Sequence, residues 1–296
     1  MDRSFSSSNQ GDHAPPDVVL YHADCSDGFG AAWALWKKYP KAKYQPVKHG
    51  FPPPTNLAGR HIVMVDFSYS RPALETMAQQ AASLQVLDHH ITAQDALAGL
   101  PFAYFDLKKS GAVLAWEWAH QQPAPWLLQY VQDKDLWNWA LPCSREINAA
   151  LASYPYDFHI WDTLRQDALE AEGRAILRYE TELVGKIAAS AVLLPFEGAI
   201  VPVVNSTVLT SQIGERLSAH HPFCVMWHDR DGRRYYSLRS RDDGADVAAI
   251  ATQYGGGGHT HAAGFSVALG AHARSPFDPL PALPDTAKQR AGRRSD

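Results

Sequence analysis

The sequence predicts an α/β protein whose N-terminal domain is built around a mostly parallel sheet. Short apolar runs at residues 18–21, 62–65 and 86–87 precede segments with helical spacing of apolar residues at 30–39, 71–84 and 110–120. Strands that alternate with helices in this way form parallel sheets covered by helices. Ligands of such sheets bind at the carboxyl ends of the strands, so the residues that follow the three runs are the first candidates for a site.

The second half of the chain predicts a long helix that leads into a smaller mixed α/β domain. Apolar residues recur near helical spacing from Leu164 to Ile187, and Asp162 or Thr163 can cap the start of that helix. The two ends of the chain have little to bury and are expected to be disordered. The predicted segments are a tail at 1–16, a first domain at 17–160, a connecting helix at 161–194, a second domain at 195–270 and a tail at 271–296.

Composition narrows the functional classes. The chain has 296 residues, 46% of them hydrophobic, and a formal net charge of −4, which argues against a broad basic surface for long duplex nucleic acid. We find no run of about 18 apolar residues and no apolar secretory segment at the N-terminus, so neither a membrane span nor export is expected. Three widely spaced cysteines do not indicate a disulfide framework. A cytoplasmic protein fits these features best.

Acids and histidines follow each of the three strand-like runs. They are His22, Asp24 and Asp27 after the first run, Asp66 after the second, and Asp88, His89 and His90 after the third. Carboxylates gathered at one sheet edge repel one another and cost several kcal/mol to desolvate, on the order of the penalty for unpaired buried charge, unless cations lie between them. The sequence therefore predicts a divalent metal site.

Each of these residues also has an ordinary structural interpretation. Asp27 can accept backbone amides at a helix start, and Asp66 can cap the helix that begins near Arg71. For each segment taken alone, capping is the better interpretation, and only the combination favours a metal site. Cys25 lies inside the first cluster, but nucleophilic catalysis would need a base placed to form its thiolate, and the metal interpretation already accounts for the neighbourhood.

Together these motifs resemble the DHH phosphoesterases, a family named for the tripeptide found here at residues 88–90. The resemblance covers most of residues 18–265. Besides the motifs named above, it includes Ser110-Gly111 at a helix start and an acidic fourth motif in residues 132–137. In the second domain, residues 237–240 and 256–264 look like the DHH-associated C-terminal domain of the nano-RNase and exopolyphosphatase-related branch.

The resemblance implies a pair of Mn²⁺ ions, with Mg²⁺ or Co²⁺ as possible substitutes. The implied ligands are His22, Asp24, Asp27, Asp66, His89 and Asp133. By the same resemblance Asp66 bridges both ions, His90 lies near the substrate phosphate as a catalytic group, and Asp88 supports the ligands without binding metal. Independently, oxygen and imidazole donors suit Mn²⁺.

Two of these assignments stay open. Relatives commonly space the first-motif acids as Asp-x-Asp, whereas here Asp24 and Asp27 are separated by two residues, which makes their roles less secure than that of Asp66. In the fourth motif both Asp133 and Asp135 qualify. Asp133 is favoured because the Leu136-Trp137 pair that follows looks like core packing, which would draw Asp135 toward a structural role.

The second domain carries a predicted phosphate site of its own. Gly256, Gly257 and Gly258 expose backbone N–H groups that can surround an anion, beside Arg239, His259 and His261. Arg239 can bind a phosphate bidentately, and His259 can donate to a phosphoryl oxygen or assist the leaving group. The plainer alternatives are a flexible loop for the glycines and a solvated strand charge for Arg239.

The expected function is metal-dependent hydrolysis of phosphodiester bonds in short oligonucleotides or other small nucleotide substrates. The alternatives are a phosphoanhydride hydrolase that acts on polyphosphate or pyrophosphate, and a non-catalytic nucleotide-binding module. Short oligonucleotides or small phosphorylated compounds are the expected partners, long duplexes and membranes are not, and a homodimer is a possible assembly.

Overall fold

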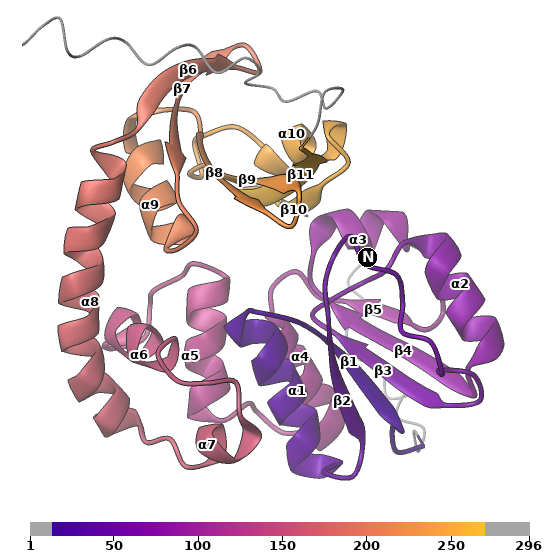
Figure 1. Ribbon diagram of the computed structural model, residues 1–296. Helices are drawn as coiled ribbons and strands as arrows, with labels where there is room; N and C mark the ends of the chain where they lie inside the picture. Colours follow the sequence, from indigo (N-terminus) through magenta and orange to yellow (C-terminus); the bar gives the residue numbers. More distant parts are fainter. Residues whose placement is uncertain (1–13, 270–296) are drawn as a thin grey trace, which may run out of the picture. The chain divides into compact units, whose positions relative to one another are not determined.

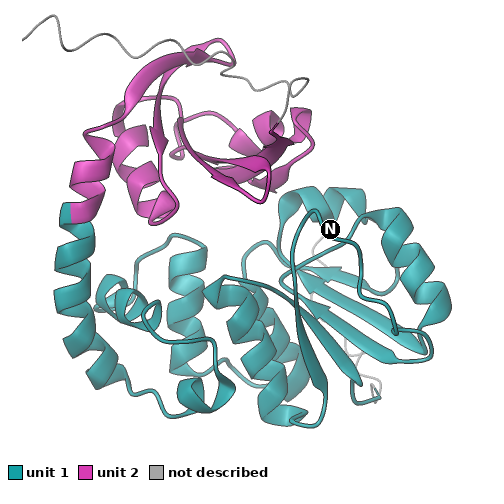
Figure 2. Ribbon diagram, viewed as in Figure 1, with its two compact units in different colours: residues 1–182 teal, residues 183–296 magenta. Residues whose placement is uncertain are grey.

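The computed structural model describes residues 14–269, which divide into two compact units (Figures 1 and 2). Unit 1 comprises residues 1–182 and unit 2 residues 183–296. Helix α8 (Gln166–Ala188) contributes to both units. The predicted tail at 271–296, and residues 1–13 of the other predicted tail, lie outside the described residues.

Unit 1 is built on a parallel five-stranded sheet, as the sequence predicts. Its strands, in the order β2-β1-β3-β4-β5, are β2 (Lys43–Val47), β1 (Val18–His22), β3 (His61–Val65), β4 (Ser83–Asp88) and β5 (Ala103–Phe105). The two outer strands, β2 and β5, have no counterpart in the sequence prediction. Strand β2 is largely polar and half-exposed and strand β5 is only three residues long, so neither shows a buried apolar run.

Helices cover both faces of this sheet (Figure 1). The helices of this unit are α1 (Ser26–Lys38), α2 (Arg71–Gln80), α3 (Ile91–Ala96), α4 (Gly111–His120), α5 (Trp126–Asp135), α6 (Ser144–Leu151) and α7 (Phe158–Asp162). Helices α1 and α4 pack on one face of the sheet and α2 on the other, while α5, α6 and α7 pack against other helices. Val19 and Val65 pack in the core cluster of α1 and α4, whereas Leu20 and Met64 pack in the cluster of α2. Because successive strand residues point to opposite faces, burial on both faces explains why β1 and β3 read as continuous apolar runs.

Several helix boundaries differ from the prediction. Helix α1 begins at Ser26 rather than near Gly30, because the Cys25 side chain caps it by accepting a hydrogen bond from the backbone N–H of Gly28 at 3.1 Å. Neither Asp162 nor Thr163, the two predicted caps, lies at the start of the long helix α8, which begins at Gln166. Asp162 instead forms an ion pair with Lys37 at 2.5 Å and ends α7. The predicted connecting segment also ends in a strand, since β6 (Val192–Phe196) begins four residues after α8 ends.

Unit 2 is a mixed α/β unit, as predicted, with a six-stranded sheet in the order β10-β11-β9-β8-β7-β6. Its remaining elements are β7 (Ala199–Asn205), α9 (Thr210–Leu217), the 3₁₀ helix η2 (Ser218–His220), β8 (Cys224–Arg230), β9 (Arg233–Arg239), α10 (Val247–Gln253), β10 (Gly257–His259) and β11 (Ala262–Ala268). Strands β7 and β8 pair in parallel, and the other neighbours pair antiparallel.

The tetraglycine segment forms an edge strand instead of an open loop. Gly257 pairs with Gly264 of β11, and Gly258 pairs with Ala263. A Cβ on Gly256 would lie 2.1 Å from the carbonyl oxygen of Gly264, so a glycine is needed for the close approach of these two backbone segments. Gly258 adds a φ of 143°, which side chains rarely adopt. Strand pairing is therefore the first reason for these glycines.

Within residues 14–269, none of the helices is both long and apolar enough to serve as a membrane span.

Two glycines of α8 should respond in opposite ways to alanine substitution. A Cβ on Gly173 would lie 1.8 Å from the carbonyl oxygen of Glu146, whereas a Cβ on Gly185 meets no atom within 4 Å. We expect G173A to lower the free energy of unfolding by about 1–3 kcal/mol through overpacking. We expect G185A to raise it by about 0.5–1 kcal/mol, because alanine favours the helix. Urea unfolding of the two variants checks this, and equal effects would contradict the packing of α8 on α6.

Candidate metal centre

The predicted acids and histidines come together at the carboxyl edge of the parallel sheet. His22, Asp66 and Asp88 end or directly follow β1, β3 and β4, which are neighbouring strands. Asp27, Asp66, Asp88 and His89 are each 2% exposed or less. Such deep burial of carboxylates without an Arg or Lys partner is unfavourable unless another positive group neutralises them.

Asp66 and His89 form the centre of the cluster. The Nε2 atom of His89 lies 3.1 Å from Oδ1 of Asp66, and both side chains are buried. Asp66 has a φ of 53°, a left-handed conformation that is unusual for a residue with a side chain. The strand therefore ends abruptly at Asp66, and local strain of this kind is characteristic of functional sites.

Asp27 connects the cluster to the N-terminus of α4. Its two carboxylate oxygens accept hydrogen bonds from the backbone N–H groups of Gly111 at 2.6 Å and Ala112 at 3.0 Å. The same carboxylate lies 3.6 Å from Nε2 of His89. A Cβ on Gly111 would come within 2.5 Å of the Asp66 Cβ, so only glycine allows α4 to begin here. The sequence prediction of a Ser110-Gly111 helix start thus has a steric basis.

The structure places Asp135, and not Asp133, in the cluster. Oδ2 of Asp135 lies 3.5 Å from Nε2 of His89. The Asp133 carboxylate is instead occupied by the backbone N–H groups of Ala140 at 3.0 Å and Leu141 at 3.1 Å. The geometry favours Asp135 over the sequence-based choice of Asp133, and which of the two binds metal stays a prediction. Asp133 holds the loop that follows α5, and Asp135, the last residue of that helix, faces the site.

Asp24 also lies apart from the acids that meet at His89. Its side chain is 67% exposed and forms an ion pair with Lys48. The extra residue in the first motif thus turns Asp24 toward solvent and leaves Asp27 in the cluster. His22 contributes, since its Nδ1 lies 3.5 Å from Oδ2 of Asp66.

Asp88 orients both histidines that follow it. Its Oδ1 accepts hydrogen bonds from the backbone N–H of His89 at 2.7 Å and from that of His90 at 3.3 Å, and lies 2.7 Å from the Nδ1 of His90. Ser68 donates to the other oxygen at 2.5 Å. A carboxylate that fixes an imidazole through its second ring nitrogen is the usual support of a metal-site histidine. Asp88 thus positions the imidazole of His90, and its role as a support for metal ligands stays a prediction.

Electrostatics show that the cluster needs positive charge. Burial, and then the neighbouring carboxylates, raise the pKa of Asp27 well above its usual value. Burial likewise raises the pKa of Asp135. Burial alone would lower the pKa of His89, but Asp135 and Asp66 outweigh it and raise that pKa well above the usual value. The carboxylates thus favour a positive neighbour, and a divalent cation would supply that charge.

The donor atoms fit divalent cations. Three groups within unit 1 each have their ligand atoms within 4.8 Å of one another: His22, Cys25 and Asp66; Asp27, His89 and Asp135; and Asp66, Asp88 and His90. Asp66 faces both sides, because its Oδ1 lies near His89 and its Oδ2 near His22. The two oxygens of Asp66 thus face different donors, and the bridging role that the family resemblance implies for this residue stays a prediction.

Cation binding should stabilise unit 1. We expect free Mn²⁺ at about 100 times its Kd to add about 2.7 kcal/mol to the free energy of unfolding. For a protein of this size that corresponds to an increase in Tm of about 5–10 °C. Thermal melting with Mn²⁺ and with a chelator measures this increase in Tm. The D66N substitution should abolish the increase. An unchanged Tm at saturating Mn²⁺ would contradict cation binding at the cluster.

In unit 2 the predicted phosphate-binding residues lie near the end of β9. The Arg239 side chain is partly buried, and its Nη2 donates to Oγ of Ser211 at 3.2 Å. His261 pairs with Ser240, with Nδ1 and Oγ 3.0 Å apart. Ala262 of β11 pairs with Arg239, which brings His261 close to the end of β9. His259 ends β10 on the neighbouring strand pair. Phosphate binding by these residues stays a prediction.

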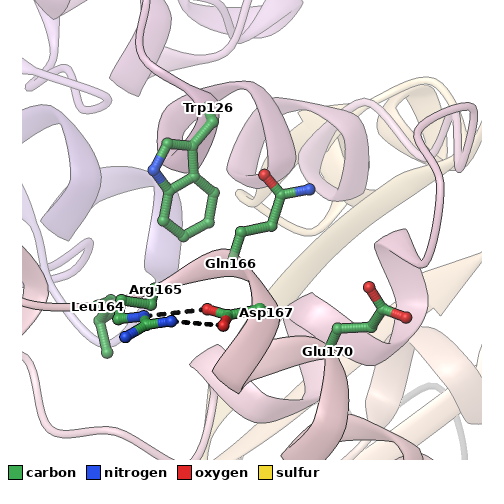
Figure 3. Close-up of a pocket in the computed structure, with 6 residues that line it drawn as sticks. All are labelled: Trp126, Leu164, Arg165, Gln166, Asp167 and Glu170. Atoms are coloured by element: carbon green, nitrogen blue, oxygen red, sulfur yellow. Dashed lines mark hydrogen bonds and ion pairs between the residues drawn. The ribbon is translucent and has the colours of Figure 1, made fainter.

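A separate hollow of about 510 Å³ lies at the start of α8 (Figure 3). It is lined by Trp126, Leu164, Arg165, Gln166, Asp167 and Glu170. Arg165 and Asp167 pair there through two hydrogen bonds of 3.1 and 2.6 Å, and both side chains are largely exposed. None of the cluster acids or histidines lines this hollow, so it offers no support for the metal centre.

Comparisons with known proteins give one relative in sequence and several in structure. No family model matches the chain. An uncharacterized protein of Acanthamoeba polyphaga mimivirus is 33% identical over 285 residues, an alignment that covers 84% of this chain and 67% of that protein.

The similar solved structures include a pGpG-specific phosphodiesterase from Vibrio cholerae, with 14% identity and a TM-score of 0.44, which covers 85% of this chain and 92% of that one. They also include an exopolyphosphatase-related protein from Bacteroides fragilis, with 12% identity and a TM-score of 0.48, which covers 84% and 85%. The DHH domain of a protein from a family of ribosomal proteins has 13% identity and a TM-score of 0.47, and covers 84% and 82%.

Proposed function

We propose that the chain is a metal-dependent phosphohydrolase of the DHH type, on the basis of the motifs that resemble that family and of the geometry of the cluster. The observation that carries this proposal is the convergence of Asp27, Asp66 and Asp135 on the Nε2 atom of His89. Buried carboxylates and imidazoles are the donors that bind catalytic divalent cations. We propose two ions, with Asp66 between them, and Mn²⁺ as the first metal to test.

Bound divalent cations would supply Lewis acidity for the phosphoryl oxygens and a water nucleophile of lowered pKa. The protein residues hold this arrangement in place. Asp27 is fixed by two amides of α4, and Asp66 is fixed by the sharp end of β3. Because each donor is held by backbone structure, little reorganisation is needed when substrate binds.

We propose that His90 acts on the substrate. Asp88 holds its Nδ1 at 2.7 Å and raises its pKa, although burial alone would lower it. A raised pKa favours the protonated imidazole, the form that can donate a proton. We propose that His90 donates through its Nε2 to a phosphoryl oxygen and stabilises the negative charge that develops there.

We propose short oligonucleotides or other small phosphodiesters as substrates. The net charge of −4 disfavours binding of long nucleic acid, because that binding depends on many contacts with phosphates. Unit 2 would bind a phosphate through Arg239, with His261 nearby. Arg239 already donates a hydrogen bond to the neutral hydroxyl of Ser211. Phosphate binding would replace that acceptor with a charged oxygen, which makes a stronger hydrogen bond.

The test is hydrolysis by the purified full chain with Mn²⁺. We expect release of mononucleotides from labelled short RNA, and much slower release of phosphate from polyphosphate or pyrophosphate. Faster phosphate release from polyphosphate would favour a phosphoanhydride hydrolase. Metal-loaded protein that binds nucleotides but cleaves none of these compounds would overturn the proposal in favour of a binding module. A chelated sample is the control.

A further inference from the structure

We propose that Cys25 is a metal ligand, so that one of the two ion positions is a mixed sulfur, nitrogen and oxygen site. The inference rests on the proposed metal centre and deepens it. It concerns a residue that sequence reasoning set aside, and it changes which metal the site should retain.

The thiol lies beside two other donor atoms. Cys25 is in the turn between β1 and α1, and its Sγ lies 3.3 Å from Oδ2 of Asp66 and 3.7 Å from Nδ1 of His22. Those two atoms are 3.5 Å from each other. The sulfur, the nitrogen and the oxygen therefore form a nearly equilateral triangle.

The dimensions of this triangle match those of a coordinated cation. With bonds of about 2.1 Å to nitrogen and oxygen and about 2.3 Å to sulfur, tetrahedral donors lie about 3.4–3.6 Å apart. The three observed separations of 3.3, 3.5 and 3.7 Å centre on that range. A cation could bind all three donors with little movement of the chain.

The local backbone fixes the thiol in this position. Asp24 has a φ of 62°, which turns its own side chain toward Lys48 and places Cys25 at the start of α1. The N–H of Gly28 donates to Sγ at 3.1 Å. A Cβ on Gly28 would lie 2.2 Å from the carbonyl oxygen of His22, so glycine is required for this tight turn. The thiol thus faces His22 and Asp66 from within the first motif.

A thiolate ligand changes the choice of metal. Thiolates select softer cations such as Zn²⁺ over Mn²⁺ and Mg²⁺, which prefer oxygen donors. Binding would release the thiol proton to solvent. We therefore expect the position at His22, Cys25 and Asp66 to retain Zn²⁺ or Co²⁺ in preference to Mn²⁺, in contrast to the all-oxygen and imidazole set that the sequence suggested.

Co²⁺ titration of the metal-free full chain tests the assignment. We expect a thiolate-to-cobalt charge-transfer absorption in the near ultraviolet for the native protein. The band should vanish in C25S and C25D and persist in C143S, the matched control, whose thiol is partly buried in the same unit. In C25D the preference for Zn²⁺ over Mn²⁺ should fall at least about tenfold, since even partners outside the ligand set change affinity 10–100-fold.

A second measurement uses only the native protein, in case the Cys25 variants do not fold. Zn²⁺ should slow the alkylation of Cys25, mapped by mass spectrometry, relative to metal-free protein, and leave that of Cys143 unchanged. Stoichiometric Co²⁺ binding without the charge-transfer band, or equal alkylation of Cys25 with and without Zn²⁺, would overturn the assignment. A band without hydrolysis of any phosphate substrate would instead overturn the proposed function and leave the ligand assignment standing.

Discussion

Replacing Asp66 with asparagine is expected to lower kcat/KM for phosphodiester hydrolysis by at least about 10³-fold, or about 4 kcal/mol of transition-state stabilisation. Asp66 faces both groups of donors, with Oδ1 at 3.1 Å from His89 and Oδ2 at 3.5 Å from His22. Asparagine keeps the shape of the side chain but removes the charge and one acceptor, so one ion position loses its Asp66 donor and the other keeps only a neutral oxygen.

Two controls separate this loss from unfolding. The metal-free D66N variant should melt as a cooperative unit, because asparagine keeps the size of the side chain and one oxygen that can accept a hydrogen bond from His89. D167N, which changes an exposed aspartate that pairs with Arg165, should retain the native kcat/KM. Native-like turnover in D66N after exhaustive chelation would contradict a metal-centred site.

The second large effect distinguishes Asp135 from Asp133. We expect D135N to lower kcat/KM by about 10²-fold or more with an unchanged free energy of unfolding, because the side chain faces His89 in the cluster. We expect D133N to lower the free energy of unfolding by about 1–3 kcal/mol, because one of the two backbone N–H groups bound by this buried carboxylate would then face an amide group.

The pair is informative because the same substitution is made two residues apart on one helix. Urea unfolding and steady-state kinetics on both variants give the comparison. If D133N lost activity at native stability while D135N stayed active, the sequence-based preference for Asp133 would be restored and the geometry of the α5 end would be contradicted.

The site residues that sequence reasoning located best are those at strand ends. Asp66 and Asp88-His89-His90 follow buried apolar runs, and the parallel topology brings the ends of such runs to one edge of the sheet. The choice between Asp133 and Asp135 was harder, because it depends on how the chain leaves a helix. Trp137 and Trp139 adopt φ values of 58° and 51°, and this turn carries the backbone amides of Ala140 and Leu141 back over Asp133.

The elements that were missed share a physical cause. Strand β2 is an edge strand with a polar sequence, and β10 is made of glycine and histidine, so neither has the apolar pattern on which the prediction depends. Their pairing is decided by neighbouring strands and by close backbone approach, which are tertiary effects. Cys25 was set aside for a similar reason, since only the folded turn shows that its sulfur meets Asp66 and His22.

The hydrogen bonds that the first amides of α4 donate to Asp27 have a consequence for biosynthesis. The two partners are 84 residues apart in the chain, and Gly111 and Ala112 complete the carboxylate's surroundings. A growing polypeptide from which only the first three strands have emerged still lacks α4. Asp27 then has no α4 amides to accept hydrogen bonds from. Ion capture should therefore come late, after α4 has emerged from the ribosome and docked, and a truncated product that ends before residue 111 should not hold a cation at Asp27.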